Sequence, residues 1–175
     1  FITENAWKKP AAPALLAPGR IELDYAGLAA QIQATIFALN DLGVGRGHAL
    51  AIVLPNGPEM ATAFLSAASA CASAPLNPNY KESEFAFYLE DLQARALLVL
   101  EGEQSPALAA AAALNVPVIT LRPGERAGEF SLHGLSQPLE DGGGVAQPED
   151  VALILHTSGT TARPKIVPLS QANLC

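Results

Sequence analysis

One short segment of the chain, residues 156–165, gathers hydroxyl side chains, a glycine and a lysine. It reads His-Thr-Ser-Gly-Thr-Thr-Ala-Arg-Pro-Lys and directly follows the apolar run over residues 151–155. Hydroxyls and backbone N–H groups donate hydrogen bonds to anionic oxygens, and Gly159 lets the backbone approach a ligand closely. Lys165 adds a positive charge, and Pro164 restricts the backbone just before it. The segment therefore predicts a loop that binds polyphosphate.

The same residues could also form a plain turn, a Walker A loop or the site of a serine nucleophile. A hydrophilic turn between two strands is the plain alternative for a segment rich in Ser and Thr. A Walker A loop is excluded, because no glycine precedes Lys165 and no Ser or Thr follows it. Ser158 lacks the Gly-x-Ser-x-Gly elbow of a nucleophile. His156 either lines the site or is simply packed at the end of a strand. The predicted phosphate-binding residues are Thr157, Ser158, Gly159, Thr160, Thr161 and Lys165.

Helix and strand patterns alternate along the part of the chain that must position this segment. Apolar residues at helical spacing, with Asp24 as a cap and Gly43 as a stop, predict a helix over residues 24–42. The apolar run over residues 49–54 predicts a strand buried on both faces, and Pro58 starts the next helix.

The alternation continues to the end of the chain. It predicts strands near residues 72–76, 96–100, 116–121 and 151–156, and helices near residues 82–92 and after the capping residue Ser105. This order predicts an α/β fold, with a largely parallel sheet and helices on both faces. In such sheets, ligands bind beyond the carboxyl ends of strands, which is where the hydroxyl-rich segment begins.

Two further expectations concern polar stretches. The Gly-rich residues 122–147 are expected to form a long surface connection within one domain. Acidic residues on the predicted helices, with the pair Glu90 and Asp91 among them, are expected to form solvated faces.

Composition narrows the classes of function. A chain of 175 residues, 50% of them hydrophobic, can bury one core. A net charge of -7, with only 10 Lys and Arg residues, argues against a nucleic-acid partner. Cys71 and Cys175 fit neither a metal site nor a disulfide framework, so we expect no metal ligands and a reducing compartment, with the cytoplasm as default. No apolar stretch reaches the roughly 18 residues of a membrane span.

The hydroxyl-rich segment resembles the phosphate-loop signature of the acyl-adenylate-forming, or AMP-binding, enzymes. This family includes acyl-CoA synthetases, adenylation domains of peptide synthetases and beetle luciferases. The likeness continues upstream through residues 23–42, 53–56 and 74–80, and Asn173 falls in the helix expected after the next strand. Ala162 and Ile166 stand where the family commonly has glycine. The opening His-Thr-Ser-Gly-Thr-Thr is similar to the branch of oxalate-CoA ligases and peroxisomal synthetases, so the peroxisome is the alternative compartment. The matching positions are Thr157, Ser158, Gly159, Thr160, Thr161, Pro164 and Lys165.

The resemblance implies a two-step ligase reaction. A carboxylic acid attacks the α-phosphate of ATP, bound with Mg2+, to give an acyl-adenylate, and the CoA thiol then displaces AMP. The matching hydroxyl residues would hold the β- and γ-phosphates, with Lys165 as counter-charge. Family members are much longer, so this chain is expected to be the N-terminal part of the large domain, to contain no catalytic residue and not to catalyse by itself. The alternatives are a non-catalytic nucleotide- or phosphate-binding module and an adenylation domain with another acyl acceptor.

Overall fold

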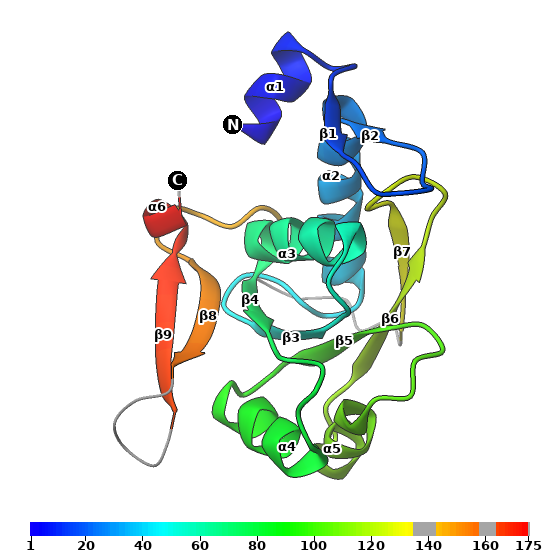
Figure 1. Ribbon diagram of the computed structural model, residues 1–175. Coiled ribbons are helices and arrows are strands. Elements are labelled where there is room, and N and C mark those ends of the chain that lie inside the picture. The colour runs from blue at the N-terminus through cyan, green and yellow to red at the C-terminus, as the bar shows by residue number, and fades with distance from the viewer. Residues whose placement is uncertain (135–142, 158–163, 175) are drawn as a thin grey trace.

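The computed structural model describes residues 1–134, 143–157 and 164–174. Within these residues the chain forms one large sheet, a small antiparallel pair of strands and several helices (Figure 1). The strands of the large sheet are β3 (Ala49–Val53), β4 (Ala72–Pro75), β5 (Ala96–Leu100), β6 (Val118–Pro123), β7 (Phe130–His133), β8 (Val151–Thr157) and β9 (Lys165–Ser170). The small pair is β1 (Pro13–Leu15) and β2 (Leu23–Asp24). The helices are α1 (Ile2–Lys8), α2 (Tyr25–Asp41), α3 (Pro58–Ala70), α4 (Glu82–Asp91), α5 (Pro106–Leu114) and α6 (Gln171–Leu174).

The strands of the large sheet lie in the order β7-β6-β5-β3-β4-β8-β9. All neighbours from β6 to β8 pair in parallel, and antiparallel pairing occurs at the two ends, where β7 joins β6 and β9 joins β8. In Figure 1, α2 and α3 lie above the sheet and α4 and α5 lie below it. The predicted α/β fold, with a largely parallel sheet covered on both faces, is confirmed.

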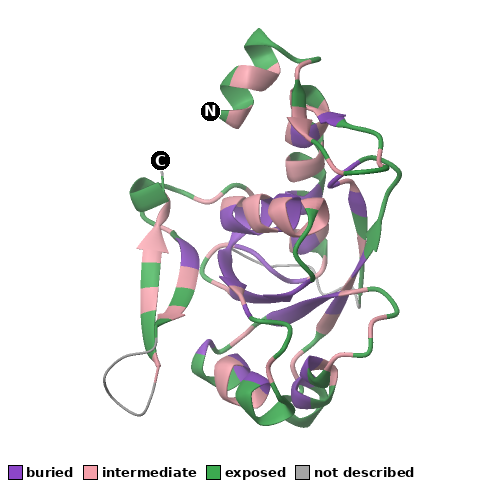
Figure 2. Ribbon diagram, in the orientation of Figure 1, coloured by how far each residue is buried: buried purple, intermediate pink, exposed green. Residues whose placement is uncertain are grey.

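The core has two layers, one on each face of the sheet. Leu50 and Ile52 of β3 belong to the layer shared with α2 and α3, while Ala51 and Val53 belong to the layer that contains Phe85 of α4. All of β3 is buried, as predicted for a strand covered on both faces, and Figure 2 shows the buried residues concentrated along the middle strands.

Local signals set the helix ends. The Oδ1 atom of Asp24 accepts a hydrogen bond of 2.7 Å from the backbone N–H of Gly27, which caps the first turn of α2. After α2, Gly43 adopts a left-handed backbone with φ of 80°. The Oγ atom of Ser105 accepts from the backbone N–H of Ala107 at 3.2 Å and caps α5. These predicted helix boundaries are confirmed.

The stretch over residues 122–147 differs from the predicted surface connection. β6 continues to Pro123, and β7 pairs with it in antiparallel register. Phe130 is 7% exposed and Ala127 is fully buried, so this part of the stretch belongs to the core. The sequence signal for β7 was weak because a four-residue edge strand with a polar outer side carries only Phe130 and Leu132 as alternating apolar residues. Residues 135–142 lie outside the described part of the chain.

Candidate phosphate-binding site

The carboxyl end of β8 and the start of β9 face each other across a hairpin. Thr157 lies opposite Lys165, and His156 lies opposite Ile166. Two of the predicted phosphate-binding residues, Thr157 and Lys165, are therefore direct neighbours at the end of the hairpin where residues 158–164 connect the strands. The other four predicted residues, Ser158, Gly159, Thr160 and Thr161, lie outside the described residues, as does Ala162.

Strand alternation sends neighbouring side chains to opposite faces of the hairpin. Ile154 packs against the core layer beside α4, so His156, two residues later, points to the same face. Thr157 points to the other face. Ile166 is 41% exposed and lies within β9, where an extended backbone accepts any residue, so the family's usual glycine is not required at this position.

His156 is held by α4. Its Nε2 atom lies 3.0 Å from Oδ2 of Asp91, the last residue of α4, and its ring meets the ring of Tyr88 edge-on at 4.6 Å between centroids. The His156 side chain is only 6% exposed, whereas that of Asp91 is 36% exposed. Asp91 is therefore engaged with β8, which corrects the expectation that this acidic pair forms only a solvated face.

An aromatic stack continues from Tyr88 away from β8. Tyr80 stacks on Tyr88 with 4.9 Å between ring centroids, and the buried Phe85 meets Tyr80 edge-on at 5.8 Å. A side-chain hydrogen bond with Tyr80, followed by burial, raises the pKa of Tyr88 to about 12. Sequence reasoning missed this cluster, although the three-residue spacing of Tyr88 and Asp91 places them on one helix face.

The chain continues from β9 into α6, which is tied to the loop before β8. Asn173 lies in α6, as expected, and its Oδ1 atom accepts hydrogen bonds from the N–H and hydroxyl of Ser170 at 3.0 and 2.9 Å. The backbone N–H of Gln171 donates to the carbonyl of Asp150 at 3.0 Å. These hydrogen bonds hold the end of β9 that lies far from Thr157.

Comparison with known proteins identifies the family of this arrangement. The family model described as AMP-binding enzyme matches residues 2–175. The chain belongs to the AMP-binding enzyme family.

Several relatives are similar over most of this AMP-binding chain. An oxalate–CoA ligase of Arabidopsis thaliana is 37% identical over 179 residues, covering 99% of this chain and 35% of that protein. An oxalate–CoA ligase of Saccharomyces cerevisiae is 37% identical over 157 residues, covering 75% of this chain and 29% of that protein. The chain therefore spans about a third of the length of these curated relatives.

A solved structure shares the fold of the AMP-binding chain. Apo MatB from Rhodopseudomonas palustris matches with a TM-score of 0.73 at 24% sequence identity, over 95% of this chain and 33% of that chain. At this identity the likeness supports the fold alone.

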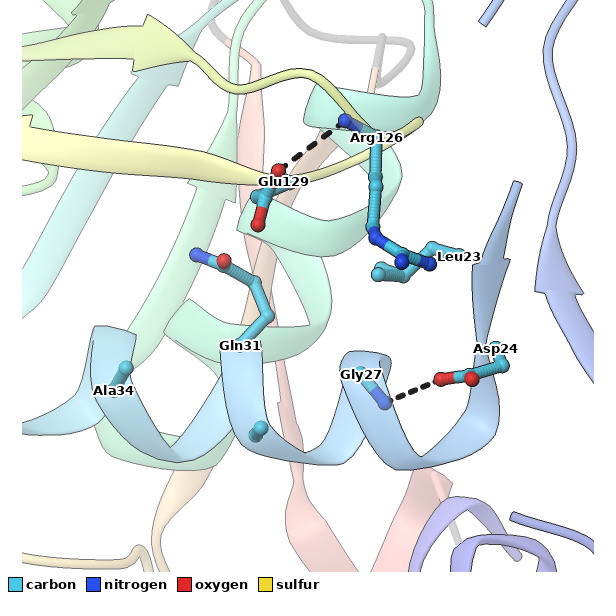
Figure 3. Close-up of a pocket in the computed structure, with 8 residues that line it drawn as sticks. Leu23, Asp24, Gly27, Gln31, Ala34, Arg126 and Glu129 are labelled. Carbon is cyan, nitrogen blue, oxygen red and sulfur yellow. Dashed lines mark hydrogen bonds between the residues drawn. The ribbon is translucent and has the colours of Figure 1, made fainter. Parts of the chain in front are cut away.

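Two cavities of the AMP-binding chain lie away from the β8–β9 hairpin end. One, of about 430 Å³, lies between α2, β2 and the β6–β7 turn (Figure 3). Its charged groups already form hydrogen bonds within the fold. Asp24 caps α2, and the guanidinium of Arg126 donates to the carbonyl of Glu22. The backbone N–H of Arg126 donates to the carboxylate of Glu129. The charged groups that line this cavity therefore stabilise the fold around it.

The other cavity, of about 540 Å³, lies at the amino ends of β3, β4 and β8. Burial, followed by the charge of Arg95, lowers the pKa of His48 in its wall. Ligands of open α/β sheets bind at the opposite, carboxyl ends of strands, so the hairpin end remains the candidate site.

Within residues 1–134, 143–157 and 164–174, no three His, Cys, Asp or Glu side chains gather closely enough to hold a metal ion. Among the helices of the same part of the chain, none has the length and apolar character needed to cross a membrane.

Proposed function

We propose that the intact protein is an AMP-forming acyl-CoA synthetase. In the first step a carboxylate oxygen attacks the α-phosphorus of MgATP, and pyrophosphate leaves. In the second step the sulfur of CoA attacks the acyl carbonyl, and AMP leaves. Membership of the AMP-binding family supports this proposal, together with the 36–37% identity to three relatives named as CoA ligases.

The observation that carries the proposal is the pairing of Thr157 with Lys165 at the end of the hairpin where residues 158–164 connect the strands. A hydroxyl donor and an ammonium group at this end are suited to an anionic ligand. In the proposed reaction, negative charge grows on the pyrophosphate oxygens as the bond to the α-phosphorus breaks. Donors already fixed near those oxygens stabilise the transition state without reorganising. We assign Thr157, Ser158, Gly159, Thr160 and Thr161 to the β- and γ-phosphates, with Lys165 as counter-charge.

For the acid, we propose a small carboxylate, and oxalate is the first to test. Two relatives from a plant and a yeast, both at 37% identity, are named oxalate–CoA ligase. The same two names favour CoA as the acyl acceptor.

A second candidate keeps adenylation but changes the acceptor. Enterobactin synthase component F of Escherichia coli K12 is 31% identical over 172 residues, covering 98% of this chain. An adenylation domain of an assembly-line synthetase would form the same acyl-adenylate and pass the acyl group to another thiol. A non-catalytic nucleotide-binding module is the remaining alternative.

The test measures two products with the intact protein, MgATP and a panel of carboxylic acids that begins with oxalate. Pyrophosphate release reports adenylation, and mass spectrometry detects the acyl-CoA thioester. The proposal predicts both products for at least one acid. Pyrophosphate without thioester would indicate another acceptor, and ATP binding without either product would indicate a binding module.

A further inference from the structure

The last part of β8 receives little support from the parallel sheet. Ser73 and Leu153 are the one residue pair in the β4–β8 ladder of the described chain. Beyond Leu153, the β8 residues up to Thr157 pair only with β9, within those same described residues. An antiparallel hairpin of two strands is marginal by itself, so side-chain contacts must set its direction relative to the sheet.

His156 makes such a contact one residue before Thr157. Its Nε2 atom lies 3.0 Å from Oδ2 of Asp91, and Tyr88 covers the ring edge-on. A side chain that is 6% exposed, with a polar partner at one ring nitrogen and an aromatic ring packed against it, has little rotamer freedom. Because α4 is anchored in the core by Phe85 and Leu89, the contact joins the strand end to a rigid element.

We propose that Asp91 and His156 form a positioning pair that fixes the end of β8 and thereby the placement of Thr157 for polyphosphate binding. The proposal rests on the proposed function of the hairpin end and adds to it Asp91, from outside the phosphate-loop segment, and His156, which directly precedes the matching positions. Neither residue touches the phosphates in this role. They act through the backbone of β8, which turns the next side chain, Thr157, to the opposite face.

The hydrogen bond between His156 and Asp91 is suited to holding the imidazole ring in one orientation. When the imidazole is neutral, the contact requires the proton on Nε2, which donates to the Asp91 carboxylate, and this bond fixes the tautomer. A hydrogen bond to an ionised acceptor is roughly twice as strong as one between neutral groups. An amide at position 91 keeps an acceptor oxygen but loses the charge, so Asp91→Asn is the conservative variant of this contact.

Glu90 provides a matched control for charge. It is the exposed neighbour of Asp91 on α4 and carries the same charge. Both Asp91→Ala and Glu90→Ala remove one negative charge from the same end of the helix. Only the first removes the contact to His156.

The experiment measures binding of magnesium pyrophosphate and of ATP to the intact protein by calorimetry, together with steady-state kinetics. Misplacing a binding group by a fraction of an ångström weakens its contacts, so we expect Asp91→Ala to raise the Kd for pyrophosphate and the KM for ATP about tenfold. Asp91→Asn should lie between Asp91→Ala and the wild type, because it keeps the acceptor. Glu90→Ala should stay within about twofold of the wild type, as surface changes usually do. The KM for the carboxylic acid should change little in all three variants.

A double-mutant cycle separates positioning from general damage. In a His156→Ala background, Asp91→Ala should have no further effect on pyrophosphate binding, because the contact is already lost. Equal pyrophosphate affinities for Asp91→Ala and Glu90→Ala, or fully additive effects in the cycle, would overturn the proposal. An intact protein that binds pyrophosphate but adenylates no acid would refute the proposed ligase activity instead, and the binding cycle would still decide the role of the pair. An intact protein that binds neither pyrophosphate nor ATP would overturn both.

Discussion

Gly128 carries the turn between β6 and β7 under α3, and replacing it with alanine tests how tightly that turn is packed. Its backbone is left-handed, with φ of 79°. An added Cβ would lie 2.5 Å from Oγ1 of Thr62, 2.6 Å from Cδ1 of Leu15 and 3.1 Å from the backbone oxygen of Pro58. Side chains can shift, but the Pro58 carbonyl is fixed at the start of α3.

The expected loss of stability in Gly128→Ala is the sum of a backbone cost and a packing cost. A left-handed backbone costs a residue with a Cβ about 1–2 kcal/mol. Inserting a methyl group into a packed site costs about 1–3 kcal/mol more. Gly102 is the matched control, because its φ of 76° is similar but an added Cβ would meet nothing within 4 Å. We therefore expect Gly128→Ala to lower the free energy of unfolding by about 2–5 kcal/mol and Gly102→Ala by about 1–2 kcal/mol.

The assay is urea-induced unfolding of both variants and the wild type, compared by midpoint and slope. The difference between the two variants reports packing, since the backbone strain is common to both. Equal losses for Gly128→Ala and Gly102→Ala would show that the turn is not packed against α3 and would refute the reasoning.

Three further predictions concern the Asp24 cap, the half-buried His48 and the proposed role of Lys165. Asp24→Ala removes the 2.7 Å cap on Gly27 and should lower the free energy of unfolding by about 1 kcal/mol, measured by thermal unfolding, with no loss contradicting the cap. The pKa of His48 is lowered in the folded state, so its contribution to stability is complete above its ordinary value of about 6.5 and is lost as pH falls through the lower folded value. His48→Gln should therefore flatten the fall in unfolding temperature as the pH drops below about 6.5, and an unchanged slope would exclude this role. Lys165→Met should raise the KM for ATP by roughly 10- to 100-fold, because it removes the charge that we propose pairs with the phosphates, and an unchanged KM would remove Lys165 from the proposed site.

Much of the fold was predictable because its signals are local. Asp24 and Ser105 cap their helices within three residues, and a continuous apolar run suffices to indicate that β3 is buried on both faces. The alternation of helices and strands then limits the topology to a largely parallel sheet. The phosphate-binding site stays a prediction; the sequence could propose it because its hydroxyls, glycine and lysine are contiguous in the chain, and the structure describes Thr157 and Lys165 among them.

The sequence by itself determined the alternation of the main helices and strands, the helix ends and the hydroxyl, glycine and lysine residues that follow β8. Only the tertiary structure decided that β7 adds to the sheet, that Thr157 lies opposite Lys165, and that Asp91 holds His156. These contacts depend on pairing register and on the packing of α4 against β8. Asp91 and His156 are 65 residues apart, so no local pattern of apolar or polar residues encodes their contact. It forms because the sheet brings β8 beside β4 and one core layer joins α4 to the same face.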